Sequence, residues 1–287
     1  MAGVAVVTDS TASLNAEHRQ DARLTVIPLQ VVIDEVSRPE DESGVTPAVV
    51  ARALRDGRSV TTSRPTPEAF SVAYGELATA GYDSVVSVHM SSVMSGTFAA
   101  AAIAAETSPI PVTVVDSGTL AMAMGFSVLS AVLAASSGRD PAAVAEVAQR
   151  RAAGATTYFL VHSLEHLRRG GRIGPAAALL GSALSIKPLL TVKGGEIRPY
   201  ERVRTASKAL ARLEELGMAA LAHAAGASDH VDVAVHHLDN LAGAEALAER
   251  LRGRAQTSLD VTVAEVSAVL GAHVGPGTLG IVVSPRL

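Results

Sequence analysis

The feature that most constrains the fold is an alternation, through the first half of the chain, of short β-branched runs with alanine-rich stretches that are typical of helices. The runs predicted as strands are Val4 to Val7, Leu24 to Val32, Ser84 to Val88 and Val112 to Val115. Each run is apolar throughout instead of alternating, so both of its faces are expected to be buried. The pattern predicts an α/β fold, with a mostly parallel sheet covered by helices on both faces.

The pattern changes after about Gly154. Two short runs, Leu189 to Val192 and Ile197 to Tyr200, flank Gly194-Gly195, a two-residue loop that favours a β-hairpin. The other elements expected in this half are strands at 157–161, 231–236, 261–266 and 278–283 and helices at 175–184, 205–216 and 241–252. We therefore predict two α/β domains, residues 1–154 and 155–287, the second with a mixed sheet, and a cleft between them.

Bulk composition excludes several classes of function. The formal net charge of −4 leaves no strongly basic footprint, so nucleic acid is not an expected partner. The absence of cysteine excludes disulfides and thiolate metal sites, and the first residues lack a basic, then apolar, leader pattern. The expected location is the cytoplasm.

An uncharged stretch from Ser117 to Gly138 has the composition of a possible membrane span. It contains glycines and several serines, and its apolar part barely reaches the length that a bilayer requires. We predict a buried helix here and no membrane insertion.

Two literal matches to catalytic motifs lack the context that their chemistry needs. His162 to His166 matches the zinc pattern H-x-x-E-H, but 168–172 breaks the helix soon afterwards and no third ligand is evident. The start of a solvated helix is the preferred interpretation, and no metal is expected. The segment 275–280 matches G-x-G-x-x-G, yet only seven residues follow it, so a tight turn into the last strand is favoured.

Asp9 and Asp116 each precede a serine at the end of a predicted strand. They are candidate general bases or ligands, but Asp and Ser are also strong helix N-caps, and capping is the favoured interpretation. No G-x-S-x-G elbow, Walker A sequence or D-F-G set accompanies them, so local evidence for a hydrolase or a kinase is missing.

Three hydroxyl- and glycine-rich turns, at 61–67, 91–97 and 272–277, lie where strands are expected to end. Hydroxyls donate to an oxyanion, glycine lets backbone N–H groups approach closely, and the helix after Ser95 would turn its positive end toward the same place. Ligands of open α/β sheets bind at the carboxyl ends of the strands. Together the turns predict a site for an anionic group.

In order and spacing, these turns resemble the DegV family. The resemblance covers nearly the whole chain, and its most specific parts are Gly-Gly-Arg-Ile at 170–173 and His-x-Gly-Pro-Gly at 273–277. Further matching segments are Thr-Asp-Ser-Thr at 8–11, the Thr-Ser-x-Pro and Ser-Gly-Thr turns, Asp-Ser at 116–117, Lys-Pro at 187–188 and Val-Arg-Thr at 203–205.

The resemblance implies a two-domain, non-enzymatic lipid-binding protein without a cofactor. It implies a long-chain fatty acid of C16 to C18, held with its tail in an apolar tunnel between the domains, whose carboxylate is offered to a separate fatty-acid kinase. The residues implied to bind the ligand are Thr62 or Ser63, Ser95, the Gly96 amide, His273 as a further donor, and Arg172 near the head group. Arg204 is implied as a position that docks the partner.

The sequence departs from the family pattern at three places. Arg64 stands where many members have Gln, and Ala121 and Ala123 replace a Ser and a Gly. Arg64 either adds charge at the mouth of the site or is an exposed turn side chain. A small-molecule kinase or hydrolase that uses Asp9, Asp116 or His273 in the same cleft remains the alternative, and it predicts turnover by the isolated protein.

Overall fold

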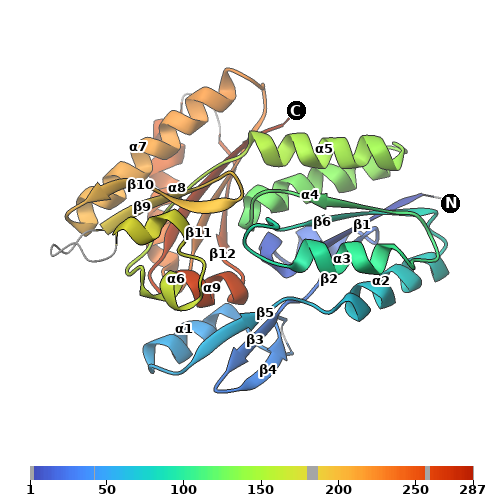
Figure 1. Ribbon diagram of the computed structural model, residues 1–287. Helices are drawn as coiled ribbons and strands as arrows, with labels where there is room; N and C mark the ends of the chain where they lie inside the picture. The colour runs from blue at the N-terminus through green and yellow to red at the C-terminus, as the bar shows by residue number, and fades with distance from the viewer. Residues whose placement is uncertain (1–2, 42, 180–186, 256–258, 287) are drawn as a thin grey trace.

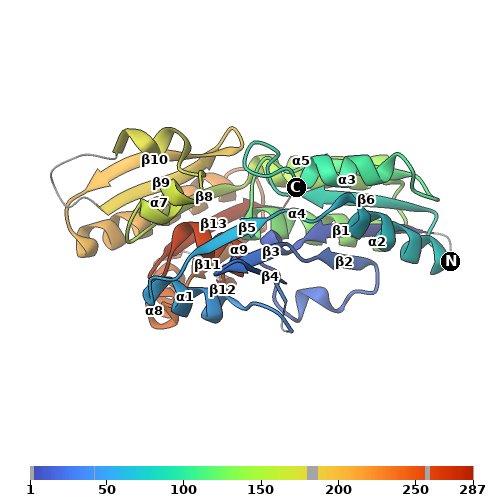
Figure 2. The ribbon, with the colours of Figure 1, turned by 60° about the horizontal axis from the view of Figure 1, so that its bottom comes forward.

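The computed structural model describes residues 3–41, 43–179, 187–255 and 259–286. These residues form a parallel sheet of four strands, a mixed sheet of six strands and a small antiparallel sheet of three strands. Figure 2 shows the two large sheets in neighbouring lobes, with the small sheet between them.

The parallel sheet confirms the predicted architecture of the first half. Its strand order is β2-β1-β6-β7, where β1 is Val4–Asp9, β2 is Leu24–Ile27, β6 is Ser84–His89 and β7 is Val112–Asp116. Helices α2 (Pro67–Thr79) and α3 (Thr97–Ala105) cover one face, and α4 (Ala121–Ser136) and α5 (Pro141–Gly154) cover the other (Figure 1). The two central strands, β1 and β6, are buried at every position, which explains why they lack polar alternation, whereas the edge strands β2 and β7 are mostly half-buried.

The predicted strand Leu24 to Val32 was wrong, because the chain divides there between two sheets. Strand β2 ends at Ile27, and β3 (Gln30–Ile33) pairs antiparallel with β4 (Val36–Pro39) and β5 (Val60–Ser63). Pro28 stands between them and has no N–H to offer a continuous ladder. Helix α1 (Pro47–Arg55) follows β4 and packs against α9 (Ala268–Val274) of the second half.

The second half forms the predicted mixed sheet, in the order β10-β9-β8-β13-β11-β12. Its strands are β8 (Thr156–Leu160), β9 (Lys187–Lys193), β10 (Glu196–Val203), β11 (Val231–His237), β12 (Val261–Glu265) and β13 (Leu279–Pro285). Only β11 and β12 pair in parallel. The β9–β10 hairpin is confirmed, and both turn glycines have positive φ, 64° and 80°, as its two-residue loop requires.

Helices α7 (Ala206–Ala225) and α8 (Leu241–Arg254) pack on one face of the mixed sheet. The helix predicted over 175–184 is instead a short 3-10 helix at Gly174–Leu179, and residues 180–184 lie outside the described residues. Helix α6 (Glu165–Arg169) precedes it.

The stretch Ser117 to Gly138 forms the buried helix that was predicted. Residues 121–128 of α4 are all buried, and the helix packs on α5 and β1. In the described part of the chain, no helix combines the length and apolar character needed to cross a membrane.

One hydrophobic cluster is shared by the two large sheets. It extends from Val6 and Val86 of the parallel sheet, through α4 and α5, to Phe159 and Val282 of the mixed sheet. The open face of the mixed sheet therefore faces the helices and loops of the first half. The predicted division at residues 154 and 155 falls between α5 and β8 and stays a prediction.

Candidate functional site

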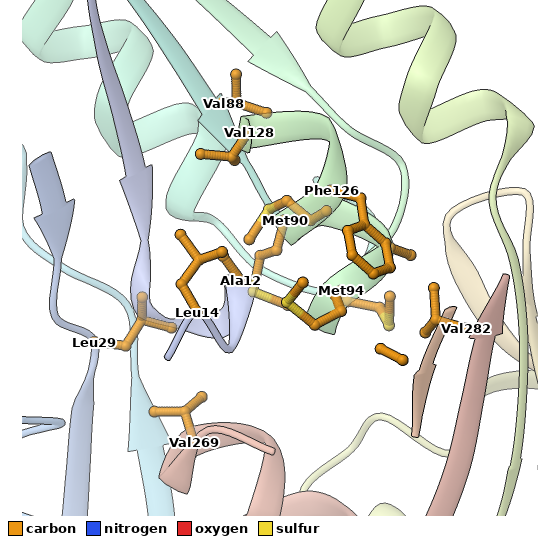
Figure 3. Packing of buried hydrophobic residues seen from close by; sticks show 14 of the residues in the cluster. Ala12, Leu14, Leu29, Val88, Met90, Met94, Phe126, Val128, Val269 and Val282 are labelled. Carbon is orange, nitrogen blue, oxygen red and sulfur yellow. The ribbon is translucent and has the colours of Figure 1, made fainter. Parts of the chain in front are cut away.

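A cavity of about 560 Å³ lies between the two large sheets and against the small one. Figure 3 shows Leu29, Met90, Met94, Val269 and Val282, all on its wall, pointing toward one common space. Further apolar lining comes from Leu120, Phe159, Val192, Ile197, Val266, Leu270, Val274 and Ile281. Its volume is that of a site for a small organic molecule, and most of its wall is apolar.

The structure brings together all six residues that the sequence indicated for ligand binding. They line this single cavity from four segments: Thr62 and Ser63 on β5, Ser95 and Gly96 before α3, Arg172 after α6, and His273 on α9. The turns at 61–67 and 91–97 lie where strands end, as expected, the first at the end of β5 in the small sheet. The same expectation for 272–277 was wrong, because this turn lies at the end of helix α9. Arg204 is exposed, follows β10 and does not line the cavity.

His273 and Thr62 form the central polar pair of the site. His273 Nε2 lies 2.8 Å from Thr62 Oγ1, while the buried Nδ1 has no hydrogen-bond partner among the described residues. Burial, and then the positive charge of Arg172, lower the pKa of His273 to about 4. The imidazole is therefore neutral at pH 7, so one of its nitrogens carries a proton and the other a lone pair.

Two glycines of the matching motifs let α6 and α9 approach closely enough to position this histidine. A Cβ on Gly170 would overlap Nδ1 of His273, and a Cβ on Gly275 would overlap the ring of His166. Gly275 also has a φ of 78°, which favours glycine. Each glycine thus makes room for an imidazole of the other helix, which lets α6 and α9 pack closely around His273.

The loop before α3 is held by both halves of the chain, and two of its hydrogen bonds cross to the second half. Ser91 Oγ donates to the Gly195 carbonyl at 2.6 Å, and Arg172 Nε donates to the Met94 carbonyl at 3.2 Å. Within the loop, Ser95 Oγ lies 2.8 Å from Thr97 Oγ1. The rim of the cavity is thus built from both halves.

Arg64 is exposed and also lines the cavity. Its guanidinium group lies against Gly96, where a Cβ would collide with it. No ion pair of Arg64 or Arg172 is found among the described residues. Two guanidinium groups without carboxylate partners therefore make the rim attractive to an anion.

Comparison with known proteins agrees with this arrangement. Residues 3–286 match the family model described as "Uncharacterised protein, DegV family". The chain belongs to the DegV family. A DegV domain-containing protein of Streptomyces coelicolor is 50% identical over 283 residues, which are 99% of each chain.

Two solved structures of DegV proteins share the fold over 99% of both chains. One, described as showing fatty acid binding by a DegV family protein from Thermus thermophilus, has a TM-score of 0.90 at 32% identity. The other, DegV from Bacillus subtilis, is described as a fatty acid binding protein and has a TM-score of 0.88 at 33% identity.

Several residues of this DegV site were not found from the sequence. Thr157, Phe159, His236 and Gly280 line the cavity from strands of the mixed sheet. Their signal is the two-residue period of a strand, which assigns residues to one face without indicating which face meets a cavity. His236 is bonded at both nitrogens: Nε2 accepts from Met122 N–H at 3.1 Å, and Nδ1 lies 3.1 Å from the Ala264 carbonyl.

Asp9 belongs to a fully buried network next to the site. Its Oδ2 lies 3.0 Å from His89 Nδ1, His89 Nε2 lies 2.7 Å from Ser87 Oγ, and Tyr74 donates to Ser87 at 2.9 Å. The order of contacts is that of a Ser-His-Asp triad. Ser87, however, is completely buried and its oxygen is occupied by Tyr74, so a substrate has no access.

The capping prediction for Asp9 is confirmed, because its Oδ1 accepts from the Thr11 N–H at the start of a 3-10 helix. The same prediction for Asp116 was wrong. Its carboxylate accepts from Ser92 and Gly118 N–H groups in two loops, and α4 begins only at Ala121. Neither aspartate lines the cavity.

The two motif matches have structural roles. Glu165 is paired with Arg168 and Arg169, which lower its pKa to about 2, and His166 packs against Gly275. Among the described residues, no group of three or more His, Cys, Asp or Glu residues is arranged to hold a metal. The segment 275–280 is confirmed as a tight turn into β13.

Proposed function

We propose that this protein binds a long-chain fatty acid in the cavity and presents its carboxylate at the rim, to a separate kinase that forms the acyl phosphate. The observation that carries the proposal is the polarity of the cavity. Its walls are largely apolar, whereas the Thr62, Ser63 and Ser95 hydroxyls and the Arg64 and Arg172 guanidinium groups gather on the segments that form one rim. Relatives of this fold described as fatty acid binding support the same ligand class.

Magnitudes assign different tasks to the two parts of such a ligand. Burial of roughly fifteen methylenes, at about 0.8 kcal/mol each, gives on the order of 12 kcal/mol before the costs of association. Hydrogen bonds to a carboxylate contribute about 1.5–3 kcal/mol each, partly offset by desolvation. The tail therefore sets the affinity, and the rim residues set the position of the head group.

His273 acts on the carboxylate through Thr62. If His273 Nε2 donates to Thr62 Oγ1, the Thr62 hydroxyl proton is free to donate to the ligand. The opposite tautomer would bury an unpaired Nδ1–H and turn the lone pairs of Thr62 toward the carboxylate, and both changes are unfavourable. An anionic ligand selects the first tautomer, so His273 is a positioning residue.

The remaining rim residues complete the head-group site. Ser95 and the N-terminal end of α3 supply a hydroxyl and backbone N–H groups, and Arg64 and Arg172 supply charge. Arg204, exposed beyond β10, is kept as the position that docks the kinase.

The first experiment is native mass spectrometry of the purified protein, followed by extraction and identification of the bound molecule. A stoichiometric C16 to C18 fatty acid is expected. The absence of any lipid, together with no uptake of added palmitate or oleate, would overturn the proposal.

Presentation is tested separately with the double variant Thr62→Ala, Ser95→Ala and a DegV-dependent fatty-acid kinase. We expect the variant to retain most lipid binding and to lose acyl-phosphate formation. Undiminished phosphorylation would contradict the assigned rim. Fatty-acid turnover by the isolated protein with nucleotide and metal would instead favour the enzyme alternative.

A further inference from the structure

The cavity is lined by three polar side chains that lie on the mixed sheet or on the turn leading into it. Among the described residues, only one of the three makes no side-chain hydrogen bond. His236 is bonded at both ring nitrogens, and the Thr278 hydroxyl donates to the Gly275 carbonyl at 2.9 Å. The hydroxyl of Thr157 has no hydrogen-bond partner among the described residues, although Thr157 is only 7% exposed. Its backbone carbonyl, by contrast, accepts from Thr191.

Thr157 lies away from the proposed head-group rim. It pairs with Val282, whereas Phe159 pairs with Gly280, closer to the turn that joins β13 to the helix of His273. Val282 is three residues into β13, so Thr157 is on the order of 10 Å along the strand from its first residue. A ligand anchored at the rim would reach Thr157 with its tail.

A free hydroxyl at this place is costly for a purely hydrocarbon tail. Closing an alkyl chain over it removes water from a donor and an acceptor and offers nothing in return. Valine has nearly the same shape, suits a β-strand equally well, and would give an unbroken apolar wall. The threonine hydroxyl therefore fits a ligand with a polar group on the same stretch of its chain.

We propose that the protein selects long-chain fatty acids that carry a hydroxyl or oxo group on the distal part of the chain, and that Thr157 recognises that group. The proposal rests on the proposed function, since it assigns the substrate class of the same cavity. Either group suits a threonine, because its hydroxyl both donates and accepts.

The test compares stearic acid with a positional series of monohydroxylated C18 acids, from the carbon beside the carboxylate to the terminal carbon. Affinities are measured by displacement of a fluorescent fatty acid from delipidated protein. We expect one distal position to bind about tenfold more tightly than the other positions, relative to stearic acid. In Thr157→Val this preference is lost, and stearic acid binds more tightly than it does to the wild type.

Thr278→Val is the matched control, because it removes a cavity-lining hydroxyl that the protein already uses. It is expected to change the affinities for plain and hydroxylated acids together and to keep their ratio. A ratio that is the same in the wild type and in Thr157→Val would overturn the selection proposal while leaving fatty-acid binding intact. Failure of every acid to bind would instead sink the proposed function.

Discussion

The molecule contains two hydroxyl–imidazole pairs with almost the same geometry and different surroundings. Ser87 and His89 lie 2.7 Å apart beside the parallel sheet's core, and Thr62 and His273 lie 2.8 Å apart at the cavity. In the first pair the chain of hydrogen bonds continues at both ends, to the Tyr74 hydroxyl and to the Asp9 carboxylate. In the second pair Nδ1 of the histidine has no partner among the described residues, and the threonine lines the cavity.

The difference shows that local pair geometry does not by itself indicate a functional site. A network in which every polar atom is satisfied and no atom reaches solvent stabilises one structure. A pair with hydrogen-bonding capacity left over, on the wall of a cavity, is able to accept a ligand. The two pairs should therefore respond in opposite ways when they are disrupted, the first in stability and the second in ligand handling.

The largest expected effect comes from Asp9→Ala, which disrupts the fully buried network of Asp9, His89, Ser87 and Tyr74. The change leaves the Met90 and Thr11 N–H groups and Nδ1 of His89 without their acceptor inside the core. We expect a loss of about 3–5 kcal/mol in the free energy of unfolding, measured by urea denaturation. A loss below about 1 kcal/mol would show that the network is not structural and would reopen a functional role for Asp9.

Much of this organisation was predictable, and the exceptions have physical causes. The parallel sheet and the Gly-Gly hairpin depend on short-range patterns, and both predictions were confirmed, although only the central strands β1 and β6 are buried at every position. The division at Pro28 was missed because an apolar run on either side of a proline looks like one strand. Asp9 and Asp116 look alike in sequence, but only tertiary packing gave one of them a helix to cap.

Only the part of the site that lies within recognisable sequence motifs, the polar rim, was predictable. The hydroxyl- and glycine-rich turns indicated an anion site, and the resemblance to the DegV family implied the six rim residues, which the structure brings to one cavity. Thr157 and His236 were missed because a polar residue in a strand gives no local sign of whether it faces a cavity or a packed helix. Sequence reasoning thus described the polar rim and left the interior wall undefined.

The pair at the cavity, Thr62 and His273, is tested by Gly170→Ala. The added Cβ overlaps the imidazole and should push His273 away from Thr62. We expect a loss of about 2 kcal/mol in stability and impaired acyl-phosphate formation. Gly171→Ala is the control: its φ is 70°, so alanine is strained, but nothing lies near the added Cβ. If both variants phosphorylate fatty acid equally, the positioning of His273 by Gly170 is refuted.

Acidification tests a third imidazole, that of His236, which is hydrogen-bonded at both nitrogens on the cavity wall. Burial lowers the pKa of His236 to about 4, from 6.5 in the unfolded chain. Between these pH values the unfolded state binds more protons than the folded state. The stabilisation that the neutral His236 gives to the folded state is therefore complete above pH 6.5 and is lost as the pH falls toward 4. Between pH 6.5 and about pH 5 the loss is about 2 kcal/mol. His236→Asn should flatten the dependence of unfolding free energy on pH, and an unchanged slope would count against burial of a neutral imidazole.

The most direct comparison removes one hydroxyl from each pair, and the Thr62 variant of the two has the smallest expected effect on stability. Ser87→Ala leaves Tyr74 and His89 unpaired in the core and should cost about 2–3 kcal/mol of unfolding free energy. Thr62→Val keeps the shape of the side chain at a half-buried position, so its cost should be about 1 kcal/mol or less.

The main effect of Thr62→Val should be on the handling of the ligand. Acyl-phosphate formation is lost, whereas fatty-acid affinity falls by less than about tenfold, because the tail supplies most of the binding energy. Calorimetric titration and a kinase assay on the two variants measure both quantities. Equal losses of stability would show that the open pair is as structural as the closed one, and the rim would then have to be sought among Ser63, Ser95 and the two arginines.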